Sequence, residues 1–343
     1  MQGKGGLRLR RSAFAGLFLS VTLLSAFASA QEARDFFQGK PLNLVVGISP
    51  GGGYDQYARL LARHYGKYLP GNPTSIVRNM PGAGSLNAVL YTADVAPADG
   101  QTVTGFNSGL VNETINDGDK AKVRFDQFAW IGSMARDLRI CFAMKESGIV
   151  SIEDLRKRKA VFGGSGVGSS SANNVAMLKN MLRLDMKIIS AYRGNTEMYL
   201  AMERREIDGS CVSWSSVPDH WVKGGRINIL ARLSQVSDPG IPQSVPFFGD
   251  LVEGNDKDVV DYLLASGEIG RPFIASRKVP QDRITALQHG FDAALRDADL
   301  LSEAEKQNLP ISPVDGKEAQ IIVTRMMAYP PDVIEKARRA IQE

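Results

Sequence analysis

Short apolar runs alternate along the chain with longer segments whose apolar residues recur every three or four positions. The apolar run 42–48, for example, precedes the segment 54–69, in which Tyr57, Leu61 and Tyr65 share one helical face. This alternation predicts an α/β protein with mainly parallel sheets. The predicted strands are 42–48, 74–79, 102–106, 129–134, 138–144, 160–163, 187–191, 209–213 and 227–233. Several helices, interrupted by prolines, are expected between residues 280 and 343.

Two glycine-rich turns each stand between a predicted strand and a predicted helix. The first is Ser49-Pro50-Gly51-Gly52-Gly53-Tyr54-Asp55, and the second is Pro81-Gly82-Ala83-Gly84-Ser85. A turn of this kind directs backbone N–H groups of the helix N-terminus at an anion. We therefore predict one concave site in which a ligand carboxylate or phosphate meets the N–H groups of Gly52, Gly53, Gly84 and Ser85. Asp55 either caps the first helix or contacts the ligand directly.

Two later turns have a similar setting and suit the opposite wall of a cleft. They are Gly163-Gly164-Ser165-Gly166-Val167-Gly168-Ser169-Ser170-Ser171 and Tyr192-Arg193-Gly194-Asn195-Thr196. Trp214 ends a predicted strand beside three serines, so it is either a ligand platform or a core residue.

Residues 1–30 have the pattern of a cleavable signal peptide. Four basic residues and no acidic residue precede the apolar run 13–27, and Ala28-Ser29-Ala30 provides a small-residue cleavage site. A membrane anchor is the alternative, but the run is shorter than the roughly 20 residues that span a bilayer. The whole chain has 41 basic and 37 acidic residues, so removal of the signal leaves 37 of each. A formally neutral mature chain has no global basic field for nucleic acid.

Sequence motifs for catalysis, metal binding or a cofactor are missing. The spacing Gly164-x-Gly166-x-Gly168 differs from that of a dinucleotide site, and the chain has neither a P-loop nor a Gly-x-Ser-x-Gly elbow. The three histidines are scattered, without metal-ligand spacing. We therefore predict no catalytic residues, no metal and no cofactor. The only two cysteines, Cys141 and Cys211, either form a disulfide in an oxidising compartment or stay as buried thiols.

Several motifs in order resemble the Bug receptors, the periplasmic solute-binding proteins of tripartite tricarboxylate transporters. The motifs are Pro50-Gly-Gly-Gly-Tyr-Asp55, Asn79-Met-Pro-Gly-Ala-Gly84, Pro97-Ala-Asp-Gly100, Gly164-Ser-Gly-x-Gly-Ser169 and Tyr192-Arg-Gly194. They are spread over nearly all of the mature chain. Gly51 stands where the family usually has alanine, and Arg193 stands where lysine is common, which leaves the ligand identity open.

The resemblance implies a type II periplasmic-binding-protein fold, with two α/β lobes joined by two crossover strands and a ligand cleft between them. Lobe 1 is expected to comprise residues 31–143 and 231–343, and lobe 2 residues 144–230. The implied function is a periplasmic, monomeric receptor that binds a small carboxylate and delivers it to membrane subunits of a tripartite tricarboxylate-type transporter. The alternatives are an exported hydrolase or lyase that uses the serine-rich loop, and a periplasmic sensory receptor.

The predicted ligand-binding residues come from the glycine turns and from the ends of predicted strands. They are Pro50, Gly51, Gly52, Gly53, Tyr54, Asp55, Gly82, Ala83, Gly84, Ser85, Asn107, Ser108, Ser165, Gly166, Gly168, Ser169, Ser170, Arg193, Gly194, Asn195 and Trp214.

Overall fold

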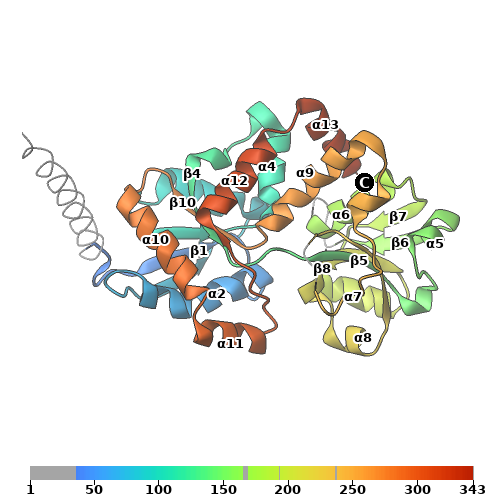
Figure 1. The fold of residues 1–343 in the computed structure, drawn as a ribbon, viewed down its shortest axis with the longest axis horizontal. Coiled ribbons are helices and arrows are strands. Elements are labelled where there is room, and N and C mark those ends of the chain that lie inside the picture. The colour runs from blue at the N-terminus through green and yellow to red at the C-terminus, as the bar shows by residue number, and fades with distance from the viewer. Residues whose placement is uncertain (1–35, 165–168, 193, 236–237, 343) are drawn as a thin grey trace, which may run out of the picture.

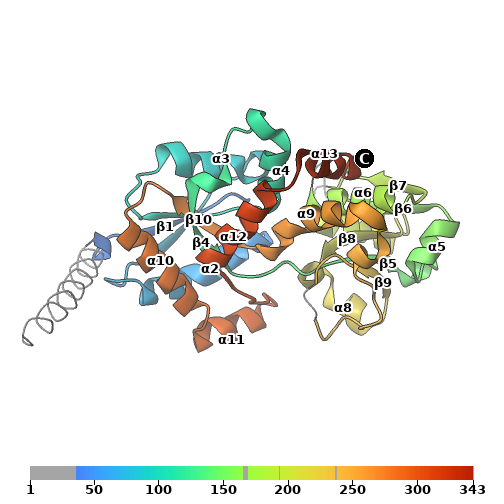
Figure 2. The same cartoon turned by 45° about the horizontal axis from the view of Figure 1, so that its top comes forward.

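A computed structural model describes residues 36–164, 169–192, 194–235 and 238–342 of the chain. The predicted signal peptide therefore lies outside the described residues. Figures 1 and 2 show two α/β lobes side by side, each built around its own sheet. None of the helices in the described ranges is long and apolar enough to span a bilayer.

The sheet of lobe 1 has six strands in the order β11-β4-β10-β3-β1-β2. Their bounds are β1 Leu42–Val46, β2 Ser75–Asn79, β3 Thr102–Gly105, β4 Phe128–Ser133, β10 Pro272–Ser276 and β11 Val314–Asp315. Strand β10 is buried along its whole length, although its five residues, opened by a proline, were not among the predicted strands. Helices cover both faces, and they are α2 Gly53–Tyr65, α3 Leu86–Leu90, α4 Gly109–Asp117, α10 Gln281–Ala294, α11 Ala298–Lys306 and α12 Gly316–Met327.

The sheet of lobe 2 has five strands in the order β7-β6-β8-β5-β9. Their bounds are β5 Arg139–Met144, β6 Ala160–Gly163, β7 Met186–Ile189, β8 Gly209–Ser213 and β9 Ile227–Arg232. The accompanying helices are α5 Ile152–Lys157, α6 Ser170–Met181, α7 Asn195–Glu203 and α8 Asp219–Lys223. Strand β5, which was expected in lobe 1, belongs to this sheet, so the first crossing lies at residues 134–138 rather than at 143.

Both sheets are mixed, which corrects the prediction of mainly parallel sheets. Strand β1 pairs in parallel with β2 and β3, and β6 pairs in parallel with β7 and β8. Strands β10 and β11 enter lobe 1 after the chain has visited lobe 2, and they pair antiparallel with β3 and β4. Strand β5 is antiparallel to both of its neighbours. Alternating strands and helices predict an α/β class but do not fix the direction of strands that return from another lobe.

The second crossing is helical. Helix α9, Lys257–Glu268, places Val260 in the hydrophobic core of lobe 2 and Ala265 in a core of lobe 1. Helix α13, Pro331–Ala340, then returns the C-terminal end to lobe 2 (Figure 1). There the Asn180 side chain donates hydrogen bonds to the carbonyls of Ala340 and Gln342, 3.0 and 2.7 Å away. The expected end of lobe 2 at residue 230 is therefore wrong. Leu233, Phe248 and Val252 pack in the core of lobe 2, so the second crossing lies at α9 and not at residue 231.

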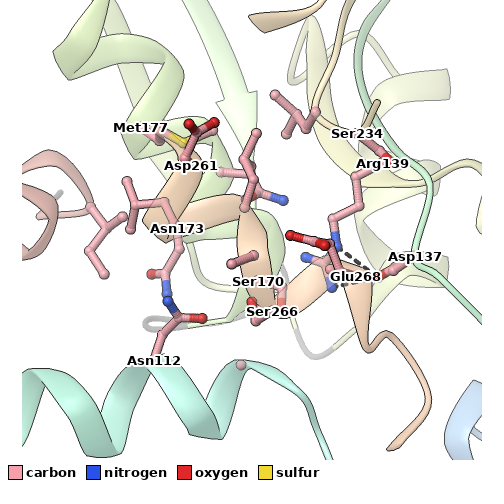
Figure 3. A pocket seen from close by; sticks show the side chains of 18 of the residues that line it. Asn112, Asp137, Arg139, Ser170, Asn173, Met177, Ser234, Asp261, Ser266 and Glu268 are labelled. Carbon is pink, nitrogen blue, oxygen red and sulfur yellow. Dashed lines mark hydrogen bonds and ion pairs between the residues drawn. The ribbon is translucent and has the colours of Figure 1, made fainter. Parts of the chain in front are cut away.

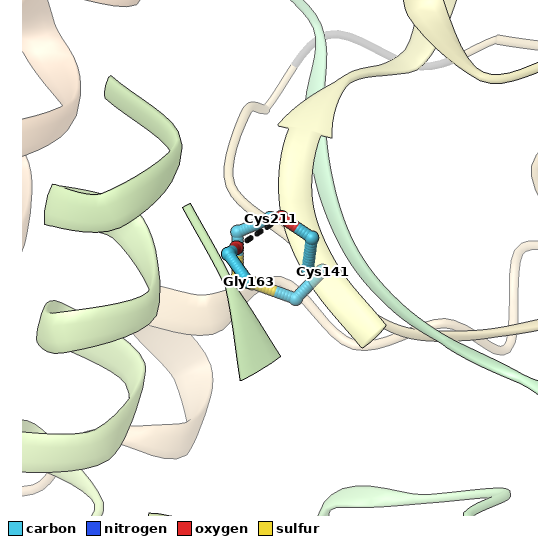
Figure 4. Close-up of a disulfide and its surroundings, with 4 residues drawn as sticks. Cys141, Gly163 and Cys211 are labelled. Carbon is cyan, nitrogen blue, oxygen red and sulfur yellow. Dashed lines mark hydrogen bonds between the residues drawn. A yellow bond between two sulfur atoms is a disulfide. The ribbon is translucent and has the colours of Figure 1, made fainter. Parts of the chain in front are cut away.

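Cys141 and Cys211 form a disulfide between β5 and β8 (Figure 4). The two residues lie directly opposite each other in the antiparallel pair, and both are fully buried. Both strands belong to lobe 2, so the bond joins neighbouring strands of one sheet and does not link the two lobes.

We expect protein purified under oxidising conditions to contain this disulfide quantitatively, because its burial protects it from reductants. Mass spectrometry after alkylation without reduction should find no alkylated cysteine, whereas two alkylated cysteines would contradict the assignment. Reduction should lower the free energy of unfolding by about 4 kcal/mol in the loop-entropy model, since the residues are 70 apart in sequence.

Candidate functional site

The first glycine turn is held in place by a buried carboxylate at the start of α2. Asp55, 2 % exposed, accepts hydrogen bonds from the Gly51 N–H at 2.8 Å, from Asn79 Nδ2 at 2.8 Å and from Arg59 Nε at 2.9 Å. Asp55 therefore faces its own lobe and occupies the Gly51 N–H, which precedes the helix; the N-cap of α2 is Gly52, and the helix has no side-chain cap. Gly52 is the N-cap of α2 and Gly53 is its first residue. Their N–H groups therefore have no acceptor within the helix.

The charge of Asp55 is part of this arrangement. Burial alone raises the pKa of a carboxyl group, but the hydrogen bonds from Arg59, Gly51 and Asn79 outweigh burial and hold the pKa of Asp55 below its ordinary value. The carboxylate is thus ionised at neutral pH and compensated by Arg59, which reaches the solvent. The turn has no requirement for a ligand to neutralise Asp55.

The second glycine turn has four consecutive residues with positive φ. The angles are 131° at Gly82, 46° at Ala83, 61° at Gly84 and 89° at Ser85, so two non-glycine residues adopt a strained conformation. Ser85 is fully buried and joins three segments: its N–H donates to the Gly82 carbonyl, its Oγ donates to the Gly47 carbonyl, and its Oγ accepts from the Asn107 N–H. Ser85 therefore has a structural role, which corrects its expected contact with an anion.

A carboxylate of the protein itself lies against the second turn. Oε2 of Glu113, on α4, is 3.6 Å from the position that a Cβ on Gly84 would occupy. Burial and the nearby Asp117 raise the pKa of Glu113 above its ordinary value. A ligand carboxylate at Gly84 would meet this negative charge, so the second turn is a poorer anion site than the first.

Tyr54 links the first turn to the N-terminus of α4. Its hydroxyl donates to Asn107 Oδ1 and accepts from the Ser108 N–H, both at 3.3 Å. Asn107 Oδ1 also accepts from the Gly109 N–H at 3.0 Å. Ser108 is 1 % exposed, so it belongs to the interior of lobe 1 and not to an accessible binding surface.

Asp137, Arg139 and Arg271 form a charged group where the chain crosses between the lobes, and we call this group the hinge cluster. Arg139 Nε and Nη2 lie 2.7 and 2.6 Å from Asp137 Oδ2, and Arg271 Nη1 lies 3.7 Å from the same oxygen. Ser213 Oγ donates to Asp137 Oδ1 at 2.6 Å. Burial opposes ionisation, but the two arginines and Ser213 lower the pKa of Asp137. One carboxylate between two guanidinium groups leaves a net charge of +1.

Arg271 extends this positive charge toward the first turn. Its guanidinium carbon lies 4.8 Å from the ring centroid of Tyr54 and 5.1 Å from that of Tyr57. Arg271 Nε is buried without a hydrogen-bond partner in the described part of the chain. Cation–π contacts therefore replace hydrogen bonds on this face of the guanidinium.

A cavity of about 580 Å³ lies between the lobes. It is bounded by α4, α6 and α9 and by the first crossing, and Figure 3 shows side chains from these elements pointing into it. Asn107 and Gly109 line it from lobe 1, and Ser170 from lobe 2. A Cβ on Gly109 would be 3.7 Å from Ser170 Oγ, so the N-termini of α4 and α6 nearly touch. The volume falls within the range of small-molecule sites.

The remaining predicted residues do not all reach this cavity. Ser169 caps α6 through its Oγ, which accepts from the Ala172 N–H. Gly194 and Asn195 open α7. Trp214 lines a separate groove of about 420 Å³ that also includes Leu309 and Pro310. Ser165, Gly166, Gly168 and Arg193 lie outside the described residues.

Eight charged residues of the cavity and the hinge cluster were not predicted from sequence, and they are Glu113, Arg136, Asp137, Arg139, Asp261, Glu268, Arg271 and Arg325. Their only sequence signal is a position next to an apolar segment, which most surface charges share. Only the tertiary structure brings them together. Within the described ranges, His, Cys, Asp and Glu form no group of three or more that is suited to a metal ion.

A search of protein-family models finds no match for this chain. The chain is 28% identical over 221 residues to a UPF0065 protein of Bordetella pertussis, covering 62% of this chain and 66% of the relative. It is 32% identical over 102 residues to a UPF0065 protein from the tcbD-tcbE intergenic region of Pseudomonas sp. strain P51, covering 30% of this chain and 29% of the relative. The alignments thus span slightly less than two thirds and less than one third of these relatives.

Solved structures of the type II periplasmic-binding-protein fold resemble nearly the whole described chain. A TctC solute binding protein from Polaromonas has a TM-score of 0.69 at 20% identity, covering 87% of this chain and 99% of that one. MatC from Rhodopseudomonas palustris, solved with bound malate, has a TM-score of 0.64 at 19% identity, covering 89% and 100%. Rpa4515 from R. palustris, solved with adipate, has a TM-score of 0.65 at 19% identity, covering 88% and 98%. The expected fold is therefore confirmed.

We expect Asp55→Ala to destabilise lobe 1 by about 2 kcal/mol at pH 7, because it leaves the Gly51 N–H and Asn79 Nδ2 without their acceptor. The folded-state pKa of Asp55 is lowered, so its stabilising contribution is present above its ordinary value of 3.8 and is lost as pH falls through the lowered pKa. Urea unfolding should therefore show a difference from the wild type that shrinks below pH 4. Asp94→Ala, at an exposed acid of the same lobe, serves as the control. A difference that stays constant down to pH 2 would contradict the role of the charge.

Proposed function

From a sequence similar to UPF0065 proteins and a fold shared with TctC-type binding proteins, we propose that the chain is a periplasmic receptor for a small carboxylate. The observation that carries this proposal is the first glycine turn. Asp55 fixes the turn by accepting a hydrogen bond from the Gly51 N–H. Gly52 and Gly53 present their backbone N–H groups at the positive end of α2. A Cβ at Gly53 would meet no atom within 4 Å, so a ligand can approach this backbone closely.

The electrostatics around the turn support an anionic ligand. Asp55 is compensated by Arg59, and the hinge cluster adds a net positive charge that Arg271 extends to the ring of Tyr54. The N-termini of α4 and α6 meet nearby and add partial positive charge. Malate and adipate in the two R. palustris structures are consistent with a carboxylate ligand for this chain.

We assign the ligand contacts of lobe 1 to Gly52, Gly53 and Tyr54, together with Asn107. Of these four residues only Asn107 lines the cavity, and its Oδ1 accepts a hydrogen bond from the Tyr54 hydroxyl. Ser170 at the start of α6 provides the nearest contact from lobe 2. The proposal involves no catalytic step. The physiological partners would be the membrane subunits of a tripartite tricarboxylate-type transporter, which receive the ligand from a monomeric receptor.

The two lobes are proposed to close around the ligand. Their connections meet where the Asp137 N–H donates to the Gly267 carbonyl at 2.7 Å, so two adjacent segments act as the hinge. A ligand that contacts both lobes favours the closed form by its additional contacts there.

Small-angle X-ray scattering should therefore show a smaller radius of gyration after saturation with a bound dicarboxylate such as malate or adipate. Identical scattering curves with and without the ligand would contradict closure.

Gly53→Val should weaken carboxylate binding at least tenfold, because the branched side chain covers the N–H groups of the turn. The fold should be unchanged, since the site around Gly53 is open and its φ is not positive. Gln56→Val, at an exposed position of the same helix, is the matched control. Isothermal titration calorimetry with malate and adipate measures the effect. Unchanged affinity in a folded Gly53→Val protein would exclude the first turn as the anion site.

A further inference from the structure

One arginine lies between the first glycine turn and the connection of the two lobes. Arg271 stands between α9 and β10, and only 11 % of its side chain is exposed. Its N–H donates to Ser133 Oγ at 2.9 Å, and its carbonyl accepts from the Met134 N–H at 3.1 Å. The backbone of Arg271 is therefore fixed to the end of β4, where the first crossing begins.

The guanidinium group of Arg271 packs against two tyrosines of α2. Tyr54 and Tyr57 are three residues apart on this helix, so their side chains are neighbours on its surface. Their ring centroids lie 4.8 and 5.1 Å from the guanidinium carbon. Arg271 Nη1 donates to the Gly270 carbonyl at 2.7 Å, whereas Nε is buried without a hydrogen-bond partner among the described residues. The position of the group thus depends on stacking and charge more than on hydrogen bonds.

Tyr54 joins this arginine to the proposed binding site. It follows Gly53 in the first turn, and its hydroxyl bonds with Asn107 Oδ1 and with the Ser108 N–H, both at 3.3 Å. Asn107 lines the cavity. A shift of the Tyr54 ring would therefore change the turn at one end of the side chain and the position of Asn107 at the other.

Arg271 is also anchored at the hinge cluster. Its Nη1 lies 3.7 Å from Asp137 Oδ2, and the other partners of Asp137 are Arg139 and Ser213 of lobe 2. A Cβ on Gly270 would be 2.6 Å from the Asp137 N atom, so the two crossings are in direct contact beside Arg271. Separating a buried ion pair leaves an uncompensated charge, which resists displacement of either partner. Asp137 therefore fixes the guanidinium group against which the Tyr54 ring packs.

We propose that Arg271 is a positioning residue for ligand binding. Anchored by Asp137 at the hinge, it holds the Tyr54 ring and thereby sets the geometry of the first glycine turn and of Asn107. This inference rests on the proposed function, which makes Gly53, Tyr54 and Asn107 ligand contacts. Arg271 is not part of the cavity lining, so its effect on affinity passes through Tyr54, unlike that of a cation that contacts the ligand.

A double-mutant cycle tests this role, with malate and adipate binding measured by isothermal titration calorimetry. Arg271→Met removes the planar charged group and keeps an unbranched chain, and Tyr54→Leu removes the ring. Each single substitution should weaken binding about tenfold. In the Tyr54→Leu background, Arg271→Met should weaken binding further by about twofold at most, because the contact is already lost. A second loss as large as the first would show that Arg271 acts without Tyr54 and would overturn the assignment.

Arg283 in α10 is a matched control from the same lobe. Its guanidinium carbon lies 3.7 Å from the ring centroid of Phe36, and its Nη1 donates to the Asp99 carbonyl at 2.8 Å. Its Nε is likewise buried without a partner in the described ranges. In urea unfolding, Arg283→Met and Arg271→Met should both lower the free energy of unfolding, whereas only Arg271→Met should weaken binding by the folded protein. Equal affinities of the two variants would reduce Arg271 to a structural residue and overturn the inference.

A second variant covers the case in which Arg271→Met does not fold. Arg271→Lys keeps a charge next to Asp137 but loses the planar group that stacks on Tyr54, so it should weaken binding about threefold or more. Unchanged affinity in the folded Arg271 variants, together with weakened binding in Gly53→Val, would overturn the positioning role and leave the carboxylate receptor intact. Binding of neither malate nor adipate to the wild-type protein would overturn both.

Discussion

The buried carboxylate of Asp137 holds the connection between the two lobes together. It accepts from Arg139 at the start of β5 and from Ser213 at the end of β8, and it attracts Arg271 just before β10. One side chain thus joins both crossings to a strand of lobe 2. Removing one partner from a buried ion pair costs about 3–5 kcal/mol, because it leaves an uncompensated charge. The hinge consequently tolerates little change at these positions.

The hinge cluster also shapes the electrostatics of the site. Its two arginines and one carboxylate leave a positive charge near Tyr54, at the end of the first glycine turn. Glu113 brings a negative charge close to the second turn, because its Oε2 lies 3.6 Å from the position that a Cβ on Gly84 would occupy.

The two glycine turns look alike in sequence but differ in what surrounds them. In the first turn, the buried carboxylate of Asp55 accepts a hydrogen bond from the Gly51 N–H. In the second turn, Ser85 is buried against Gly47, and Glu113 lies over Gly84. A Cβ on Gly47 would be 2.5 Å from the Cβ of Ser85, so close packing between the two turns requires glycine there. The second turn thus supports the first.

The sequence alone determined the α/β class, most strand positions and the two-lobe fold, and it left open whether Cys141 and Cys211 are bonded. These features depend on local periodicity, turn residues and motif order, all of which are properties of the linear sequence. It did not determine that β10 is a central strand, that β5 belongs to lobe 2, or that both sheets are mixed, because strand order and direction depend on long-range packing. The first glycine turn was recognisable as a sequence motif. The hydrogen-bond partners of Asp55 and Ser85, and the position of Glu113 beside Gly84, were not. The contacts that make one turn accessible and the other occupied join residues that are distant in sequence, so only the tertiary structure decided them.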